Sequence, residues 1–177
     1  MRPASFHVLR GLVRPPHTAL VQTHGSFGSK YHLSRTAVIL TTHLGTEHTM
    51  CKTYDTHNNS TESEWCSVLD GIQYAFKRGE SSVELENNNL GVIWSLIKKE
   101  VPPKQYIAEY YAAIYSHVNL LEYFSIRWIP RRFNRADVLF QIRQSVYGEI
   151  QIPLMGDDPL QELADKVNLL YEHRGSG

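Results

Sequence analysis

The stretch Ser125-Ile-Arg-Trp-Ile-Pro-Arg-Arg-Phe-Asn-Arg-Ala-Asp-Val-Leu139 changes from a strand pattern to a helix pattern, and the rest of the chain is arranged around it. Apolar and polar side chains alternate over residues 124–128, which predicts a short strand with one buried face. Pro130 ends this strand, because proline cannot donate a hydrogen bond to a ladder. Asn134 is a suitable helix N-cap, and apolar side chains follow it at helical spacing.

Asp137 lies in the first turn of this predicted helix, just beyond the end of the predicted strand. The helix dipole stabilises a carboxylate at such a position. The position leaves three roles open for Asp137: a solvated acid at a helix start, a metal ligand, or an acid–base group.

The composition is that of a folded protein of ordinary domain size. The chain has 177 residues, of which 42% are hydrophobic and 20% are charged. Its formal net charge is zero, so a nucleic-acid surface has to come from local clustering of basic residues. No apolar run approaches the length needed to cross a bilayer, so no membrane partner is expected. Cys51 and Cys66 are too few and too far apart for a zinc site or a disulfide scaffold.

Strand patterns dominate the first third of the chain, over residues 19–23, 35–42 and 48–54. Short polar turns separate them, which predicts an antiparallel meander. A helix follows, because Thr61 and Glu64 have the spacing of a capping box and apolar side chains then recur at helical spacing.

Helices and strands alternate in the later part of the chain. A strand is predicted over residues 82–86, helices over 90–97 and 106–123, an extended segment over 150–154, and a last amphipathic helix from Asp158. Helices between later strands imply parallel pairing in the middle of a mixed sheet.

The N-terminal residues 1–18 carry several arginines and no acid. This composition is typical of a mitochondrial targeting segment, and a basic arm that lies on RNA or on a partner is the alternative. The first hypothesis predicts a mitochondrial location, and the second is compatible with a cytoplasmic one.

Several motifs together resemble the ribonuclease H fold, and in particular its reverse-transcriptase-like branch. They are His24-Gly25-Ser26, Ser63-Glu64-Trp65, Val83-x-Leu85-x-x-Asn88-Asn89, and Trp128-Ile-Pro-Arg-Arg-x-Asn134-x-Ala-Asp137-x-Leu139. The resemblance covers residues 19–148 and implies an α/β fold with a five-stranded mixed sheet, made of a three-strand meander plus parallel strands and flanked by helices. Residues 149–177 then form a C-terminal extension with one amphipathic helix.

The resemblance also implies a set of site residues. In this family four carboxylates bind two Mg²⁺ ions that assist cleavage of the RNA strand of a hybrid. Their positions fall on His24, Glu64, Asn88 (Asn87 if the register slips by one) and Asp137. Two acids are therefore kept, and two are replaced by neutral groups.

Two carboxylates do not offset the repulsion between two divalent cations a few ångströms apart. The nearest further acids, Glu62 and Glu86, are not placed to compensate, since one lies two residues from Glu64 on a helix and the other further from the strand end. We therefore predict a catalytically degenerate site without metal or cofactor. The alternative is an active ribonuclease H that binds Mg²⁺ or Mn²⁺ with the altered ligand set.

Basic residues cluster around Pro130, and an aromatic residue lies among them. The predicted nucleic-acid-binding residues are Arg127, Arg131, Arg132, Phe133 and Arg135, where the arginines would contact phosphates and the ring would stack on a base. A solvated basic surface is the alternative. Five tyrosines between positions 106 and 123 indicate a protein neighbour. The predicted function is an RNA- or protein-binding component of a larger ribonucleoprotein, for which the mitochondrial ribosome is a candidate.

Overall fold

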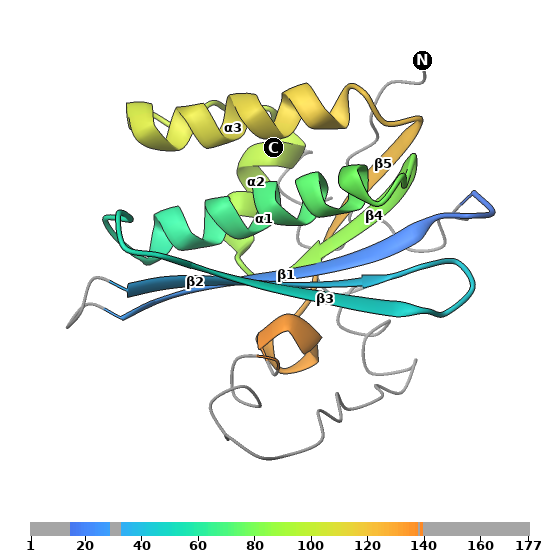
Figure 1. Ribbon diagram of the computed structural model, residues 1–177. Helices are drawn as coiled ribbons and strands as arrows, with labels where there is room; N and C mark the ends of the chain where they lie inside the picture. Colours follow the sequence, from blue (N-terminus) through green and yellow to red (C-terminus); the bar gives the residue numbers. More distant parts are fainter. Residues whose placement is uncertain (1–14, 29–32, 138, 140–177) are drawn as a thin grey trace, which may run out of the picture.

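The structure is a computed structural model that describes residues 15–28, 33–137 and 139. The predictions for the N-terminal arm, for the extended segment at 150–154 and for the last helix lie outside these residues. The described elements are β1 (Ala19–Gly28), β2 (Leu33–Thr41), β3 (Glu47–Tyr54), α1 (Ser60–Lys77), β4 (Ser82–Asn87), α2 (Leu90–Lys98), α3 (Gln105–Val118), β5 (Tyr123–Trp128) and a 3₁₀ turn, Arg131–Phe133 (Figure 1). Among them, no helix is long and apolar enough to span a membrane.

The strands form one mixed sheet in the order β3-β2-β1-β4-β5. The strands β1, β2 and β3 pair antiparallel as the predicted meander, with His24 opposite Ala37. Strand β4 pairs in parallel with both β1 and β5. The five-stranded mixed sheet predicted from the sequence is thereby confirmed.

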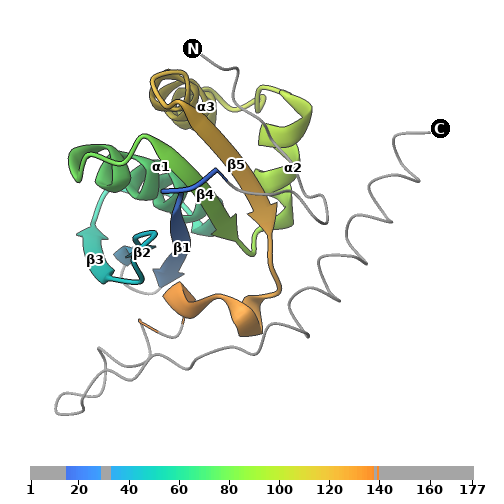
Figure 2. The ribbon, with the colours of Figure 1, turned by 90° about the vertical axis from the view of Figure 1, so that its right-hand side faces the viewer.

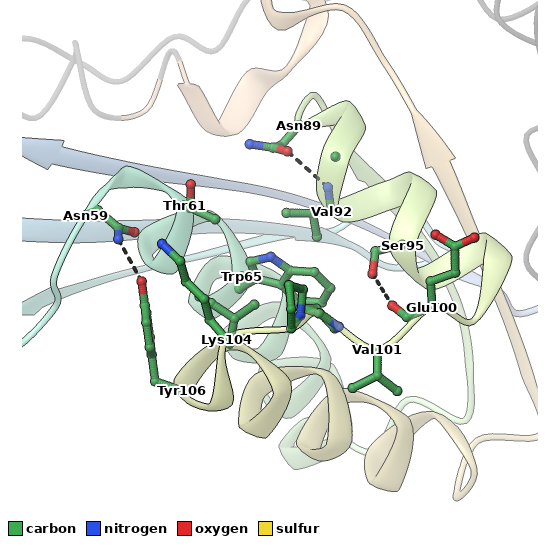
Figure 3. Close-up of a pocket in the computed structure, with 14 residues that line it drawn as sticks. Asn59, Thr61, Trp65, Asn89, Val92, Ser95, Glu100, Val101, Lys104 and Tyr106 are labelled. Atoms are coloured by element: carbon green, nitrogen blue, oxygen red, sulfur yellow. Dashed lines mark hydrogen bonds between the residues drawn. The ribbon is translucent and has the colours of Figure 1, made fainter.

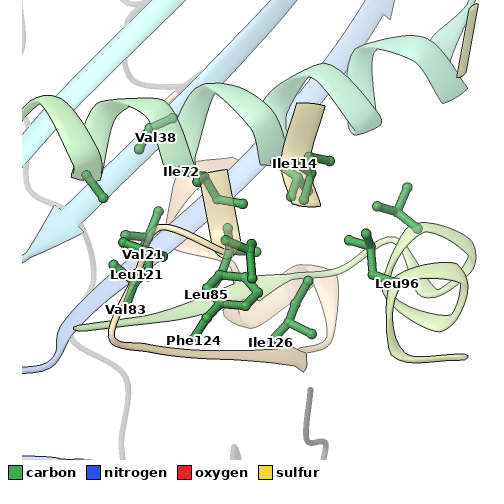
Figure 4. Close-up of a cluster of buried hydrophobic side chains, with 14 of the residues drawn as sticks. Val21, Val38, Ile72, Val83, Leu85, Leu96, Ile114, Leu121, Phe124 and Ile126 are labelled. Atoms are coloured by element: carbon green, nitrogen blue, oxygen red, sulfur yellow. The ribbon is translucent and has the colours of Figure 1, made fainter. Parts of the chain in front are cut away.

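The helices α1, α2 and α3 cover one face of the sheet, and the segment after β5 lies on the other face (Figures 1 and 2). The main core fills the space beneath the helices with fully buried side chains from both layers, among them Val21, Val38, Ile72, Leu85, Leu96, Ile114, Phe124 and Ile126 (Figure 4). On the opposite face, Ala136 and Leu139 pack against Ala37 and Ile39 of β2. This smaller cluster anchors the chain around Asp137 against the sheet.

Two helix boundaries differ from the prediction. Helix α1 is capped by Asn59, whose side chain accepts a hydrogen bond from the Glu62 backbone at 2.9 Å, so the predicted Thr61–Glu64 capping box does not form. Helix α3 ends at Val118 instead of Tyr123, because the backbone N–H of Glu122 donates to Ser81 at 2.8 Å and leads the chain into β5. The first difference leaves the Glu64 carboxylate available for another role.

The tyrosines of α3 connect this helix to its neighbours through their hydroxyl groups. Tyr110 donates to Glu62 of α1 at 2.9 Å, and Tyr115 donates to the Leu96 carbonyl of α2 at 2.7 Å. Tyr106 accepts a hydrogen bond from Asn59 at 2.8 Å. These contacts give the tyrosines a role inside the fold, while the protein neighbour stays a prediction.

Candidate functional site

The structure brings the four predicted site residues together at one end of the central strands. The imidazole of His24, on β1, lies between the other three: Nδ1 is 3.2 Å from Asn88 Oδ1 and 3.5 Å from Glu64 Oε1, and Nε2 is 3.1 Å from Asp137 Oδ1. Strands β1 and β4 run parallel, so Asn88, just past the end of β4, lies beside His24, from which β1 continues to Gly28. Asn88 rather than Asn87 faces His24, and the catalytic role of these positions stays a prediction.

Gly25 lets helix α1 approach β1 closely enough to place Glu64 in the site. A Cβ atom at position 25 would lie 2.7 Å from the Glu64 backbone nitrogen and would overlap with the Ser63 carbonyl group. The backbone N–H of Gly25 donates to Glu64 Oε1 at 3.3 Å. Because glycine has no side chain, α1 can lie this close to β1, and the Gly25 N–H then orients the Glu64 carboxylate.

Three asparagine side chains, Asn87, Asn88 and Asn134, connect the ends of the strands and are called here the asparagine network. The amide of Asn134 donates to the Thr23 carbonyl at 2.8 Å and to Asn88 Oδ1 at 2.7 Å. Asn87 donates to the same carbonyl at 3.0 Å. Asn134 Oδ1 accepts from the Ala136 backbone at 3.1 Å, as predicted for an N-cap. The long-range contacts of Asn134 were not predicted, because a capping pattern describes only local bonds.

Asp137 is shared between two basic side chains. Besides the contact with His24, its Oδ2 lies 3.0 Å from Arg131 Nε, and its Oδ1 is 3.5 Å from Arg131 Nη2. The Asp137 side chain is 13% exposed, whereas that of Arg131 is 70% exposed. Arg131 therefore joins the buried site to the surface, and its hydrogen bond with Asp137 raises the pKa of its guanidinium.

The protonation of the site follows mainly from burial. Burial raises the pKa of Glu64 to about 7, although the Gly25 N–H bond acts in the opposite direction. Burial lowers the pKa of His24, while the Asp137 carboxylate and the Asn88 amide oppose this effect. The raised pKa favours the protonated form of the Glu64 carboxyl at neutral pH more than in a solvent-exposed glutamate. Because Arg131 also pairs with Asp137, the site carries little net negative charge.

Within the part of the chain that the structure describes, no group of three or more His, Cys, Asp or Glu side chains is arranged to hold a metal ion. Glu62 and Glu86 do not supply further ligands. Glu62 accepts hydrogen bonds from Asn58 and Tyr110, and Glu86 pairs with Arg127.

The predicted nucleic-acid-binding residues fall into two groups. Arg127 pairs with the buried carboxylate of Glu86, and Arg135 Nη2 lies 2.5 Å from Glu47 Oε1, so both arginines serve ion pairs within the fold. The remaining three, Arg131, Arg132 and Phe133, form the 3₁₀ turn beside the site and are called here the arginine turn. In it the guanidinium of Arg132 lies 4.9 Å from the centre of the Phe133 ring.

A cavity of about 490 Å³ lies between the N-terminal ends of α1, α2 and α3 (Figure 3). The capping residues of all three helices, Asn59, Asn89 and Lys104, line it together with apolar side chains such as Trp65 and Val92. Helix starts and Lys104 favour an anion, whereas Glu100 of the same lining opposes one. The side chains of Asn59 and Asn89 already accept from the backbone N–H groups of Glu62 and Val92. The sequence predicted the start of each helix separately, but it did not predict that the three starts lie close together.

Comparison with protein families gives a match over the part of the chain that holds this site. The family described as "Reverse transcriptase-like" matches residues 22–139, which include all four site residues. A comparison with curated proteins finds no match.

Solved structures of ribonucleases H share the fold at low sequence identity. Ribonuclease H1 of the archaeon Halobacterium salinarum has a TM-score of 0.62 at 13% identity, over 67% of this chain and 90% of that one. The N-terminal ribonuclease H domain of a Mycobacterium tuberculosis protein has a TM-score of 0.59 at 13% identity, over 74% and 99%. LC11 ribonuclease H1, which was isolated from compost by a metagenomic approach and solved with an RNA/DNA hybrid, has a TM-score of 0.61 at 17% identity, over 73% and 99%.

At these identities the structural likeness establishes the fold alone. The family match covers well over half of the 177 residues and includes the site, helices α1 to α3 and all of the sheet except the first three residues of β1. The chain therefore belongs to the reverse transcriptase-like family of ribonuclease H-like proteins.

Proposed function

We propose that this protein binds RNA or an RNA/DNA hybrid without cutting it. The family membership supports a function that involves nucleic acid. One structural neighbour was solved with an RNA/DNA hybrid, and we extend this ligand class to the present chain as part of the proposal. In this chain, the residues at the four site positions stabilise the fold, and the basic surface beside them binds the nucleic acid.

The chemistry of the four site positions carries the proposal. A pair of Mg²⁺ ions needs several anionic oxygens that are free to coordinate. Here only two carboxylates are present, and Asp137 already pairs with His24 and Arg131. Glu64 Oε2 is buried without a hydrogen-bond partner, but the raised pKa of the carboxyl favours a proton there. These residues do not fit two magnesium ions.

The arginine turn supports the binding part of the proposal. Arg131 and Arg132 are exposed side by side at the mouth of the site, where guanidinium groups can contact phosphates. Phe133 is half-buried beside them and presents a ring on which a base can stack.

The cellular setting belongs to the proposal as well. The basic, acid-free residues 1–18 support a mitochondrial location, and a non-cutting nucleic-acid-binding protein suits a ribonucleoprotein such as the mitochondrial ribosome. Sedimentation of the tagged full chain with mitochondrial ribosomal particles after cell fractionation would test this placement.

Binding and cleavage can be tested with the same labelled substrate. The purified chain is mixed with a hybrid whose RNA strand is labelled, in separate reactions with Mg²⁺ and with Mn²⁺. We expect a shifted complex on a native gel and intact RNA on a denaturing gel. Cleavage that disappears in the Asp137→Asn variant would instead support a metal-dependent ribonuclease H. A chain that binds neither the hybrid nor the RNA strand alone would refute the binding proposal.

Replacing Arg131 and Arg132 together by alanine is expected to lower the affinity for the hybrid by about tenfold near physiological salt. Two lost phosphate contacts should also reduce the slope of log affinity against log salt by about two. Fluorescence anisotropy over a salt series measures both quantities. The matched control is Lys77→Ala with Arg78→Ala, at the opposite end of α1, which should leave the affinity unchanged. Equal losses in both double variants would mean that the arginine turn is not the binding face.

A further inference from the structure

The site joins four segments that are far apart in the sequence. His24 belongs to β1, Glu64 to α1, and Asn88 to the connection between β4 and α2, while Asn134 and Asp137 follow β5. Side-chain contacts join His24 to Asn88 and to Asp137, and Asn134 to Asn88. Helix α1 is joined through Glu64, which accepts from the Gly25 backbone N–H and lies 3.5 Å from His24. The site therefore joins four segments at a point where no single helix or strand connects them.

Most oxygen atoms in the site already accept a hydrogen bond from the protein. Asn88 Oδ1 accepts from Asn134 at 2.7 Å, and the Thr23 carbonyl accepts from Asn134 at 2.8 Å. Asp137 is held by His24 on one oxygen and by Arg131 on the other. Neutral amides and basic side chains thus occupy directions that a coordinated ion would need.

Charge explains why this arrangement can be stable without an ion. Four carboxylates at these distances would repel one another, and a bound cation would be needed to offset the repulsion. With His24 and Asn88 at two of the positions, two carboxylates remain in place of four, and the imidazole lies between Glu64 and Asp137. Most polar atoms of the site are hydrogen-bonded within it, except Glu64 Oε2, which has no hydrogen-bond partner. The bonded part of such a buried network contributes to holding the fold together.

We propose that these residues form a metal-free staple, defined as His24, Glu64, Asn88, Asn134, Asp137 and Arg131, which holds the four segments together without a divalent cation. The staple also holds the arginine turn, because Arg131 and Asn134 belong to it and flank Arg132 and Phe133. It shares with the proposed function the premise that the site takes up no Mg²⁺, but it does not require that the chain binds nucleic acid, so the unfolding test and the binding test can have different outcomes.

Thermal unfolding of the full chain in EDTA and in millimolar Mg²⁺, at equal ionic strength, tests the staple. For the unchanged chain we expect the same Tm in both buffers. The double variant His24→Asp with Asn88→Asp should unfold about 5 °C or more below it in EDTA, because carboxylate repulsion replaces hydrogen bonds. Mg²⁺ should recover much of this loss, because an ion that binds only the folded state raises its stability.

A matched control is His117→Asp with Asn119→Asp, the same pair of substitutions at the end of α3 and away from the staple. Its Tm should show no response to Mg²⁺. A rise of several degrees in the Tm of the unchanged chain in Mg²⁺ would overturn the proposal, and so would a double staple variant that is as stable in EDTA as the unchanged chain.

If the double staple variant does not fold, Asn88→Asp alone decides, since it keeps the acceptor oxygen and adds one charge. The Tm of Asn88→Asp should then be lower than that of the unchanged chain in EDTA and should rise again in Mg²⁺. The absence of either change would overturn the proposal.

Discussion

The Gly25→Ala variant is expected to lose about 3 kcal/mol or more of its folding free energy, which is a large part of the stability of an ordinary domain. The added methyl group would meet the backbone of Ser63 and Glu64 at the start of α1. Backbone atoms inside a helix cannot move aside as the end of a flexible side chain can. The helix would have to shift away from β1 and lose packing against the core.

Urea unfolding followed by circular dichroism measures this effect, and Gly28→Ala is the matched control. Gly28 belongs to the same strand, but a methyl group there would meet only the Leu33 carbonyl oxygen at an ordinary distance of 3.8 Å. We expect a lower midpoint for Gly25→Ala and little change for Gly28→Ala. Similar midpoints for the two variants would show that α1 does not approach β1 as closely as described.

The Glu64→Gln variant is expected to be more stable than the unchanged chain at pH 8, by up to about 3 kcal/mol. Burial raises the pKa of Glu64 from 4.5 to about 7, so the folded state holds this proton more tightly than the unfolded state. The unchanged chain therefore loses stability as the pH rises from about 4.5 to about 7. Glutamine has no charge to bury, and its oxygen can still accept the Gly25 N–H bond.

Urea unfolding at a series of pH values measures the difference between the two chains. We expect the two stabilities to agree near pH 4.5, to diverge between about pH 4.5 and 7, and to stay apart above that range. Glu109→Gln, on the exposed side of α3, is the control and should follow the unchanged chain throughout. A Glu64→Gln variant that is less stable at pH 8 would mean that the ionised carboxylate is stabilised by a partner such as a cation.

The sequence predicted the elements whose causes are local. Alternation before Pro130, the cap at Asn134 and the β-branched runs predicted the strands and the place of Asp137 in the segment that follows the last of them. The motifs around His24, Glu64 and Asn88 then predicted which residues meet, and the structure brings them within hydrogen-bonding distance.

Features that depend on register and burial could not be predicted in this way. Arg127 pairs with Glu86 because the two lie opposite each other on β4 and β5, and this register is not evident from either strand alone. Arg135 reaches Glu47 only because the segment after β5 folds under the meander. The pKa of Glu64 depends on how deeply α1 buries it. Local sequence patterns contain none of these long-range relations.

We propose that the site takes up no divalent cations. Calorimetric titration of Mg²⁺, and separately of Mn²⁺, into the purified chain with a bound RNA/DNA hybrid tests this proposal. We predict no saturable heat beyond that of the hybrid alone. Saturable uptake of two ions per chain, abolished by Asp137→Asn, would contradict the account.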